Sequence, residues 1–304
     1  MRYIPFSTLR KARAFLIKSA LAAVALLMFQ AAQAEDIATL STIKTDPALA
    51  AMVPKIYRER GTLVAGVNPD VKPIKFVDDD GNFAGFTPDL LSAAAKVLNL
   101  KVELTQTSFD ALIPGLSSGR LDVLLSLADF DSRHKVVTFI DYLDMGDTLI
   151  VSPKSTVAVH SYSDLCGLQV ALPRGSATVP KSTEISKECV KSGKKPLSVA
   201  TYPDSNMTLL SLSTGASQVA WVDSPVGNYN ASQFPEKYKV AFYAALAPYG
   251  IGFGTDQNGK QLAAVMQLAL QKLNEDGVYG ALLKKWGLDT KDGRPLFPIN
   301  SAKL

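Results

Sequence analysis

Residues 109–141 read FDALIPGLSSGRLDVLLSLADFDSRHKVVTFID, and this stretch decides the fold class. A short amphipathic helix and a turn are expected first, followed by a strand from Leu121 to Leu127 in which only Asp122 and Ser126 are polar. A mostly apolar strand is typical of a parallel sheet that is covered on both faces. Arg133 follows six residues beyond the end of this strand. Because ligands of open α/β sheets bind just past the carboxyl ends of the strands, this guanidinium is a candidate to hold a carboxylate in a bidentate fork.

Strand and helix signals alternate along the rest of the chain, which predicts an α/β fold. The clearest helix is GFTPDLLSAAAKVL, residues 85–98. Thr87 is expected as its N-cap, Pro88 at its first helical position, and Asp89 near the positive end of its dipole. The other expected strands cover residues 62–67, 101–104, 168–172, 197–202, 219–222, 239–243 and 249–253, and the other expected helices cover residues 205–212, 261–274 and 277–287.

Residues 1–34 have the features of a targeting segment and are kept out of the fold argument. Five basic residues and no acidic residue precede or flank an apolar run at 20–29, which is short for a membrane span. Ala32-Gln33-Ala34 matches a signal-peptidase site, so we expect a cleaved signal peptide and Glu35 at the mature N-terminus. The alternative is an uncleaved anchor. Since no cysteine stands near this site, a free secreted protein is expected rather than a lipoprotein.

The net charge of the exported part differs from that of the whole chain. The formal charge is +4 over 304 residues, and removal of the five basic residues of the segment 1–34 leaves 270 residues with a charge of −1. Without a basic excess to meet phosphates, nucleic acid is not expected as a partner. A length of 270 residues suits one large or two medium domains.

The chain has two cysteines, Cys166 and Cys189. An even pair in an exported protein predicts a disulfide, which would stabilise the fold by about 3 kcal/mol in the chain-entropy model. Two free thiols are the alternative, and the spacing is not the C-x-x-C of redox proteins.

Several motifs in the same order resemble a known family. The pattern LIPGL…GRLD, followed by a strand, an arginine and a phenylalanine, resembles the amino-acid-type periplasmic solute-binding proteins of ABC importers, which are the bacterial extracellular solute-binding proteins of family 3. GFTPDL at 85–90 is similar to the family's GFDVDL, and residues 277–287 are similar to its closing helix. The resemblance extends from Gly61 to Asp289.

The resemblance implies a periplasmic-binding-protein-like fold, with two α/β lobes joined by a two-strand hinge. Residues 61–150 and 244–288 are expected to form lobe 1, and residues 151–243 lobe 2. Residues 35–60 are expected to form an adaptor helix that starts at Asp46-Pro47. Its apolar face would consist of Leu49, Met52, Val53 and Ile56. Residues 289–304 form a C-terminal tail to which no role is assigned.

The resemblance also implies a ligand site between the lobes. Arg133 of lobe 1 is expected to bind an α-carboxylate and Asp223 of lobe 2 an α-ammonium, although both could be ordinary surface charges. Ala128 stands where the family usually has a hydroxyl, so only its backbone N–H can serve. The remaining expected contacts are Ser126, Ser176, Ala177, Phe109 and Asn68.

The nature of the ligand's side chain is less constrained. The resemblance places aromatic residues at the positions of Val71 and Ile74, which are aliphatic here, and Asn68 replaces an acid used by binders of basic amino acids. A neutral or polar side chain is therefore expected rather than a cationic one. The alternative is a ligand with an acidic side chain, which Lys72, Lys75 and Arg174 could bind.

The resemblance implies a monomeric periplasmic binding protein that delivers an amino acid or related zwitterion to the membrane permease of an ABC importer. No cofactor and no metal are expected, because His134 and His160 lack metal-ligand spacing. The first alternative is a receptor with the same clamp that reports to a sensor. The second is a small-acid dehydratase-like enzyme, with Asp70 or Asp129 as the general acid.

Overall fold

The computed structural model describes residues 43–288 and 293–302, and the predicted signal peptide at 1–34 lies outside the described residues. The fold described here is that of the compact unit formed by residues 44–304. Within the described ranges, no helix combines the length and the apolar character that a membrane span requires.

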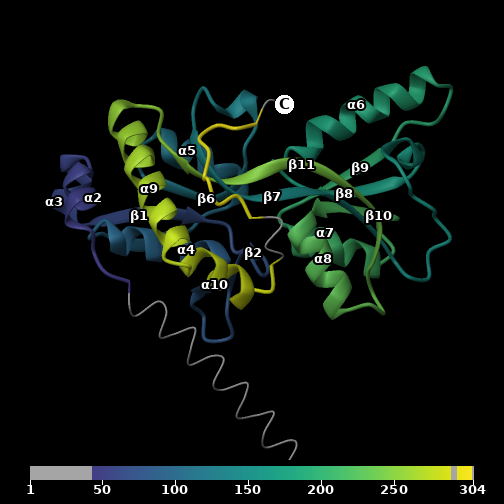
Figure 1. Ribbon diagram of the computed structural model, residues 1–304. Coiled ribbons are helices and arrows are strands. Elements are labelled where there is room, and N and C mark those ends of the chain that lie inside the picture. Colours follow the sequence, from purple (N-terminus) through teal and green to yellow (C-terminus); the bar gives the residue numbers. More distant parts are fainter. Residues whose placement is uncertain (1–42, 289–292, 303–304) are drawn as a thin grey trace, which may run out of the picture. The chain divides into compact units, whose positions relative to one another are not determined.

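One eight-stranded sheet organises residues 44–304, with the order β5-β1-β6-β11-β7-β10-β8-β9 (Figure 1). Strand β1 pairs in parallel with β5 on one side and β6 on the other. Strand β8 likewise pairs in parallel with β9 and β10. The two long strands β7 and β11 pair antiparallel with each other and join the two groups. The bounds are β1 Thr62–Val67, β5 Lys101–Gln106, β6 Val123–Ala128, β7 Thr138–Val151, β8 Gln169–Pro173, β9 Ser198–Tyr202, β10 Val219–Asp223 and β11 Lys239–Phe253.

The predicted α/β fold is confirmed, and so is the strand predicted from Leu121 to Leu127, which is β6. All six residues of β6 are buried, which is the burial that a central parallel strand covered on both faces requires. Two strands were expected at 239–243 and 249–253, and this is wrong, because β11 runs through both as a single strand. Its register shifts between Ala245 and Pro248, where the proline cannot donate a ladder hydrogen bond. The irregularity coincides with the interval between the two strands that were expected from the sequence.

Helices lie on both faces of this sheet. In Figure 1, α6 lies on one face of the β10-β8-β9 group, and α7 and α8 lie on the other. Helix α8 was not expected from the sequence. The bounds are α2 Pro47–Met52, α3 Lys55–Arg60, α4 Phe86–Val97, α5 Leu112–Ser117, α6 Thr178–Lys191, α7 Ser205–Ser213, α8 Ser224–Gln233, α9 Gln257–Glu275 and α10 Val278–Lys285.

Helix α4 confirms the expected buried stripe but begins differently. Leu90 and Leu91 are fully buried. The N-cap is Gly85 at φ 127°, whereas Thr87 and Pro88 lie inside the first turn, so the expected capping role of Thr87 and first position of Pro88 are wrong. A Cβ at Gly85 would lie 2.5 Å from the carbonyl oxygen of Ile74, so only glycine allows this close approach.

The adaptor helix was expected over residues 35–60; residues 35–42 lie outside the described residues, and residues 47–60 form two short helices. Asp46 caps α2 as predicted, since its side chain accepts from the backbone N–H groups of Ala48 and Leu49. Pro54 separates α2 from α3, because the residue before a proline is driven to an extended conformation. The expected apolar face is also wrong: Val53 is buried, but Met52 and Ile56 are 47% and 55% exposed.

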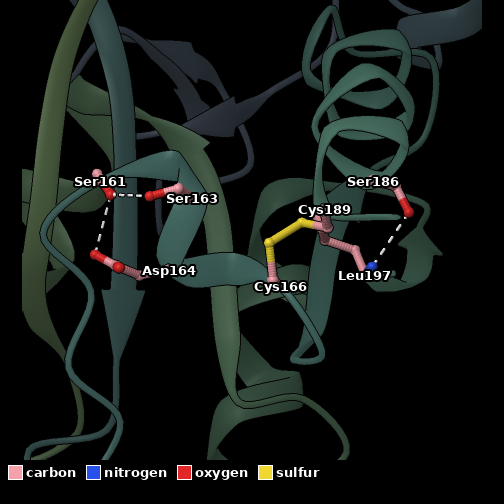
Figure 2. Close-up of a disulfide and its surroundings, with 7 residues drawn as sticks. All are labelled: Ser161, Ser163, Asp164, Cys166, Ser186, Cys189 and Leu197. Atoms are coloured by element: carbon pink, nitrogen blue, oxygen red, sulfur yellow. Dashed lines mark hydrogen bonds between the residues drawn. A yellow bond between two sulfur atoms is a disulfide. The ribbon is translucent and has the colours of Figure 1, made fainter. Parts of the chain in front are cut away.

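The predicted disulfide is present. Cys166, after the 3₁₀ turn η3 Tyr162–Leu165, bonds Cys189 in the last turns of α6, with the Cα atoms 5.6 Å apart (Figure 2). Nearby, the backbone N–H of Leu197 donates to Ser186 Oγ at 3.2 Å. Cys189 packs in the core cluster that surrounds Trp221. The bond therefore ties α6 to the start of β8.

A smaller three-stranded sheet follows β1 in the chain. It contains β2 Asp70–Val71, β3 Lys75–Val77 and β4 Phe83–Ala84 in antiparallel order. Strands β3 and β4 are joined by a tight turn, in which the N–H of Asp78 donates to the carbonyl oxygen of Asn82 at 2.8 Å. This small sheet brings Asp70 and Lys75 close to the end of β1.

The described part of the C-terminal tail runs along β7. Ile299 forms an antiparallel bridge with Ile140, and Gly293 forms one with Leu143. The side chain of Phe297 is fully buried. Residues 293–302 therefore act as an extra strap on β7.

Candidate functional site

A single cavity contains all eight residues that the sequence singled out as ligand contacts. It lies where the carboxyl ends of β1, β6, β8 and β10 meet. Parallel strands place their carboxyl ends at the same edge, which is why residues distant in sequence converge here. The predicted lining residues are Asn68, Phe109, Ser126, Ala128, Arg133, Ser176, Ala177 and Asp223. The others are Asp70, Val71, Lys75, Pro173, Thr178, Pro203, Asp204, Ser205 and Tyr249.

Arg133 projects into this cavity from η2 Asp131–Arg133, the 3₁₀ turn that follows β6. Its Nη1 donates to the carbonyl oxygen of Ala128 at 2.8 Å, and its guanidinium lies 5.3 Å from the ring centroid of Phe130. Burial lowers the pKa of Arg133, and the charges of Asp223 and Asp129 oppose that shift. Among the described residues, the other guanidinium donors have no recorded hydrogen-bond partner. They are available to an anion.

Asp223 ends β10 and occupies the N-cap position of α8. One carboxylate oxygen accepts a hydrogen bond from the hydroxyl of Tyr249. Burial raises the pKa of Asp223 to about 6, and the charge of Asp147, its neighbour on β7, acts in the same direction. The Tyr249 hydroxyl and the charge of Lys75 oppose the rise. An added cation beside Asp223 would therefore favour the ionised form further.

Three polar side chains form a chain of hydrogen bonds across the floor of the cavity. Lys75 is 1% exposed, and its Nζ donates to the side-chain oxygen of Asn68 and to the carbonyl oxygens of Leu125 at 3.1 Å and Ser126 at 3.3 Å. The amide of Asn68 donates to Asp70 Oδ1 at 2.6 Å. Burial lowers the pKa of Lys75 to about 8, against the charges of Asp70 and Asp223.

The carboxylate of Asp70 also reaches the other side of the cavity. Its Oδ2 accepts from the backbone N–H of Ser205, the first residue of α7, at 2.9 Å. Burial raises the pKa of Asp70, and the charge of Lys75 opposes that rise. The residue before Ser205 is Asp204, which caps α7 through Met207 N at 2.7 Å. Two carboxylates thus stand beside each other at this end of the cavity.

The hydroxyls of the two expected serine contacts are used within the protein. Ser126 Oγ donates to Thr87 Oγ1 at 2.9 Å and accepts from the hydroxyl of Tyr142 at 2.8 Å. Ser176 Oγ donates to the carbonyl oxygen of Pro173 at 2.7 Å. Ser126 therefore offers the cavity its backbone, at φ 54°, rather than its hydroxyl.

The start of α6 forms one wall of the cavity. Ala177 is the N-cap of this helix and makes no side-chain cap hydrogen bond. The N–H groups of the first turn and the dipole favour an anion at this point. A Cβ at Gly175, which has φ +77°, would lie 3.5 Å from the ring of Phe109, so the loop before α6 passes close to that ring.

The sequence singled out Asp70 only as a general acid and Lys75 only as a partner for an acidic side chain, and it assigned no role to Tyr249 or Asp204. An acid and a base three and eight residues after the end of β1 were the available signal for the first two. Tyr249 enters the site because it pairs with Ala128 across β11 and β6, which local sequence does not report. Asp129, the other acid considered, does not line the cavity; it bonds His134 and the N–H of Ala302.

Comparison with known proteins identifies the family of this chain. Residues 63–289 match the bacterial extracellular solute-binding proteins, family 3. The chain is 30% identical over 249 residues to the arginine-binding protein ArgT of Corynebacterium glutamicum, covering 80% of each chain. It is similar to an ancestral arginine-binding protein bound to arginine, with TM-score 0.66, 28% identity and coverage of 75% and 98%. It is also similar to an ancestral amino acid-binding protein that is a precursor of cyclohexadienyl dehydratase, with TM-score 0.65, 26% identity and coverage of 75% and 96%.

Proposed function

The chain belongs to the bacterial extracellular solute-binding proteins of family 3, and on that premise we propose that its solute is an amino acid or a related small zwitterion. One observation carries the proposal: Arg133, beyond β6, and Asp223, at the end of β10, line the same cavity with opposite charges. The arginine-binding and amino acid-binding names of the similar proteins support it.

Each end of the zwitterion has a partner with spare hydrogen-bonding capacity. Arg133 binds the α-carboxylate with the donors that Ala128 does not use, assisted by the N–H groups at the start of α6. Asp223 binds the α-ammonium with the oxygen that Tyr249 does not occupy. Each charge-assisted hydrogen bond contributes about 1.5–3 kcal/mol.

Closure about a hinge accounts for how the site opens and fills. The proposed lobe 1 is residues 61–150 and 244–288, and the proposed lobe 2 is residues 151–243. The strands β7 and β11 are the segments that run from one group of parallel strands to the other, which supports their role as the hinge. Because Arg133 and Asp223 belong to different lobes, ligand binds both only in the closed form and shifts the equilibrium towards it.

Members of this family are extracellular or periplasmic binding proteins. The proposed route to the periplasm is a signal peptide cleaved after Ala34, and the proposed partner is the membrane permease of an ABC importer. The protein is proposed to act as a monomer that releases its solute unchanged. The similar proteins named above are binding proteins, which supports binding over catalysis.

A thermal-shift screen of the secreted protein against the common amino acids tests this function. At a ligand concentration of a hundred times Kd, binding should stabilise the folded state by about 2.7 kcal/mol. For Arg133→Ala the shift should disappear, because the α-carboxylate loses its guanidinium. Arg120→Ala, which changes an exposed arginine outside the cavity, is the matched control and should shift like the wild type. The proposal fails if no amino acid stabilises the wild type, or if Arg133→Ala responds like the control.

A further inference from the structure

The cavity holds more negative charge than a zwitterion can balance. Besides Arg133 and Asp223, its charged lining residues are Lys75, Asp70 and Asp204. Among the described lining residues, three carboxylates therefore face two cations, and one negative charge remains in excess. A zwitterion leaves that excess unchanged, whereas a ligand with one net positive charge cancels it. Closing a cavity over an uncompensated charge is costly, so the cationic ligand is favoured.

The buried ammonium of Lys75 does not offer itself to an acidic ligand. An ammonium has three donors, and the protein uses all three, on Asn68, Leu125 and Ser126. Burial leaves no route for these hydrogens to turn towards the cavity without breaking a bond to the protein. Lys75 therefore holds the floor of the cavity together and neutralises one of its carboxylates.

The carboxylates of Asp70 and Asp204, by contrast, retain acceptor capacity. An ionised carboxylate has about four acceptor positions. Asp70 uses two, one from Asn68 and one from Ser205 N. Asp204 uses one oxygen for Met207 N, and among the described residues no donor is recorded for its second oxygen. Because Ser205 is adjacent to Asp204, the hydrogen bond from its N–H to Asp70 keeps the two carboxylates together.

We infer that the ligand is an amino acid with a cationic side chain, and that Asp70 and Asp204 are the specificity-determining residues that receive it. This inference rests on the proposed function, because it places the ligand's α-groups on Arg133 and Asp223. The sequence expectation of a neutral or polar side chain came from Asn68 and from the aliphatic residues Val71 and Ile74. The structure places two acids nearby, one two residues later in the chain and one at the start of α7. Asn68 instead connects Lys75 to Asp70.

Arginine and citrulline form the decisive ligand pair, because they have the same length and shape and differ in the charge of the terminal group. Titration calorimetry of the secreted protein should show arginine binding at least about 10-fold more tightly than citrulline. Glutamate should not bind as tightly as arginine. The factor corresponds to one charge-assisted hydrogen bond.

Two variants locate the preference. Asp204→Asn keeps the helix cap, because asparagine caps as well as aspartate, and removes only the charge. It should weaken arginine roughly 10- to 100-fold and leave citrulline nearly unchanged. Asp70→Asn should act in the same direction. Asp79→Asn, in the exposed β3–β4 turn, is the control and should bind both ligands like the wild type.

The outcomes separate this inference from the proposed function. If no amino acid binds, the proposed function fails. If citrulline or glutamate binds as tightly as arginine, or if Asp204→Asn keeps the preference for arginine, the inference fails and the proposed function stands. The melting curve of Asp70→Asn shows whether this variant folds. If it does not fold, the inference is still tested by the arginine and citrulline affinities of the wild type and of Asp204→Asn.

Discussion

A residue of this site can bind a ligand only with the hydrogen-bond donors and acceptors that the protein itself does not use. Lys75 and Ser126 lie in the cavity wall, but their polar groups are bonded to the protein itself. Arg133 and Asp223 each have one bond to the protein and further capacity beyond it. Residue type and position alone do not separate these two groups, whereas the contacts do.

Ligand affinity should fall in acid because of Asp223. Burial raises the pKa of this carboxyl to about 6 in the unliganded protein, so below pH 6 it is mostly protonated and must release a proton to bind an α-ammonium. Affinity measured by calorimetry should therefore be about 10-fold weaker at pH 5 than at pH 7. Asp223→Asn should bind weakly at both values with a flatter profile. A wild-type affinity that does not change between pH 5 and pH 7 would contradict the assignment.

At the scale of elements, the C-terminal strap is the clearest case of a segment held by specific partners. Asp141 on β7 is fully buried; its Oδ2 accepts from the N–H of Ser301 at 3.1 Å and from the Ser301 hydroxyl. Arg294 bonds Asp144 at 2.7 Å, and Phe297 fills the space between strap and core. The strap thus covers β7 with one buried carboxylate at its centre.

That carboxylate should make stability depend on pH. Burial raises the pKa of Asp141 to about 7, so its contribution to folding is complete below the unfolded value near 4 and is lost as pH rises through 7. The loss is up to about 1.4 kcal/mol per pH unit in that interval. Asp141→Asn, which keeps an acceptor for Ser301, should reduce the fall in melting temperature between pH 5 and pH 8. Asp276→Asn, an exposed acid on the C-terminal side of α9, serves as the control. Equal pH profiles for the wild type and Asp141→Asn would rule this out.

For the whole molecule, contacts between the two proposed lobes border the cavity. Asp70 bonds Ser205 N at 2.9 Å, and Arg174 lies 3.5 Å from Asp110. The second pair is exposed and contributes little, whereas the first is partly buried. A molecule joined by β7 and β11 and held together at such contacts is suited to open and close.

Small-angle scattering should detect the closure. Saturating ligand is expected to lower the radius of gyration of the wild type, since only the closed form satisfies both Arg133 and Asp223. Arg133→Ala should show no change at the same ligand concentration, and Arg120→Ala should behave like the wild type. A radius of gyration that ligand leaves unaltered in the wild type would argue against a hinge mechanism.

The local sequence pattern was sufficient to predict much of the fold of this protein. The period of the apolar residues predicted β1, β6, α4 and most of the other strands of the large sheet, but not α8, and the order of the motifs predicted the family. The eight site residues that the resemblance to the family implied line one cavity. Only Arg133 was also expected there from its position beyond the carboxyl end of a strand. The cysteine pair also follows from composition and export.

The charge state of the cavity, and the selectivity proposed from it, depended instead on contacts between distant segments. The Lys75–Asn68–Asp70 chain, the pairing of Tyr249 with Ala128 and the approach of Asp204 to Asp70 join parts of the chain as far apart as residues 70 and 205. Burial and hydrogen bonding set which groups ionise and which can still bind a ligand. These quantities are properties of three-dimensional surroundings, so no local stretch of the sequence encodes them.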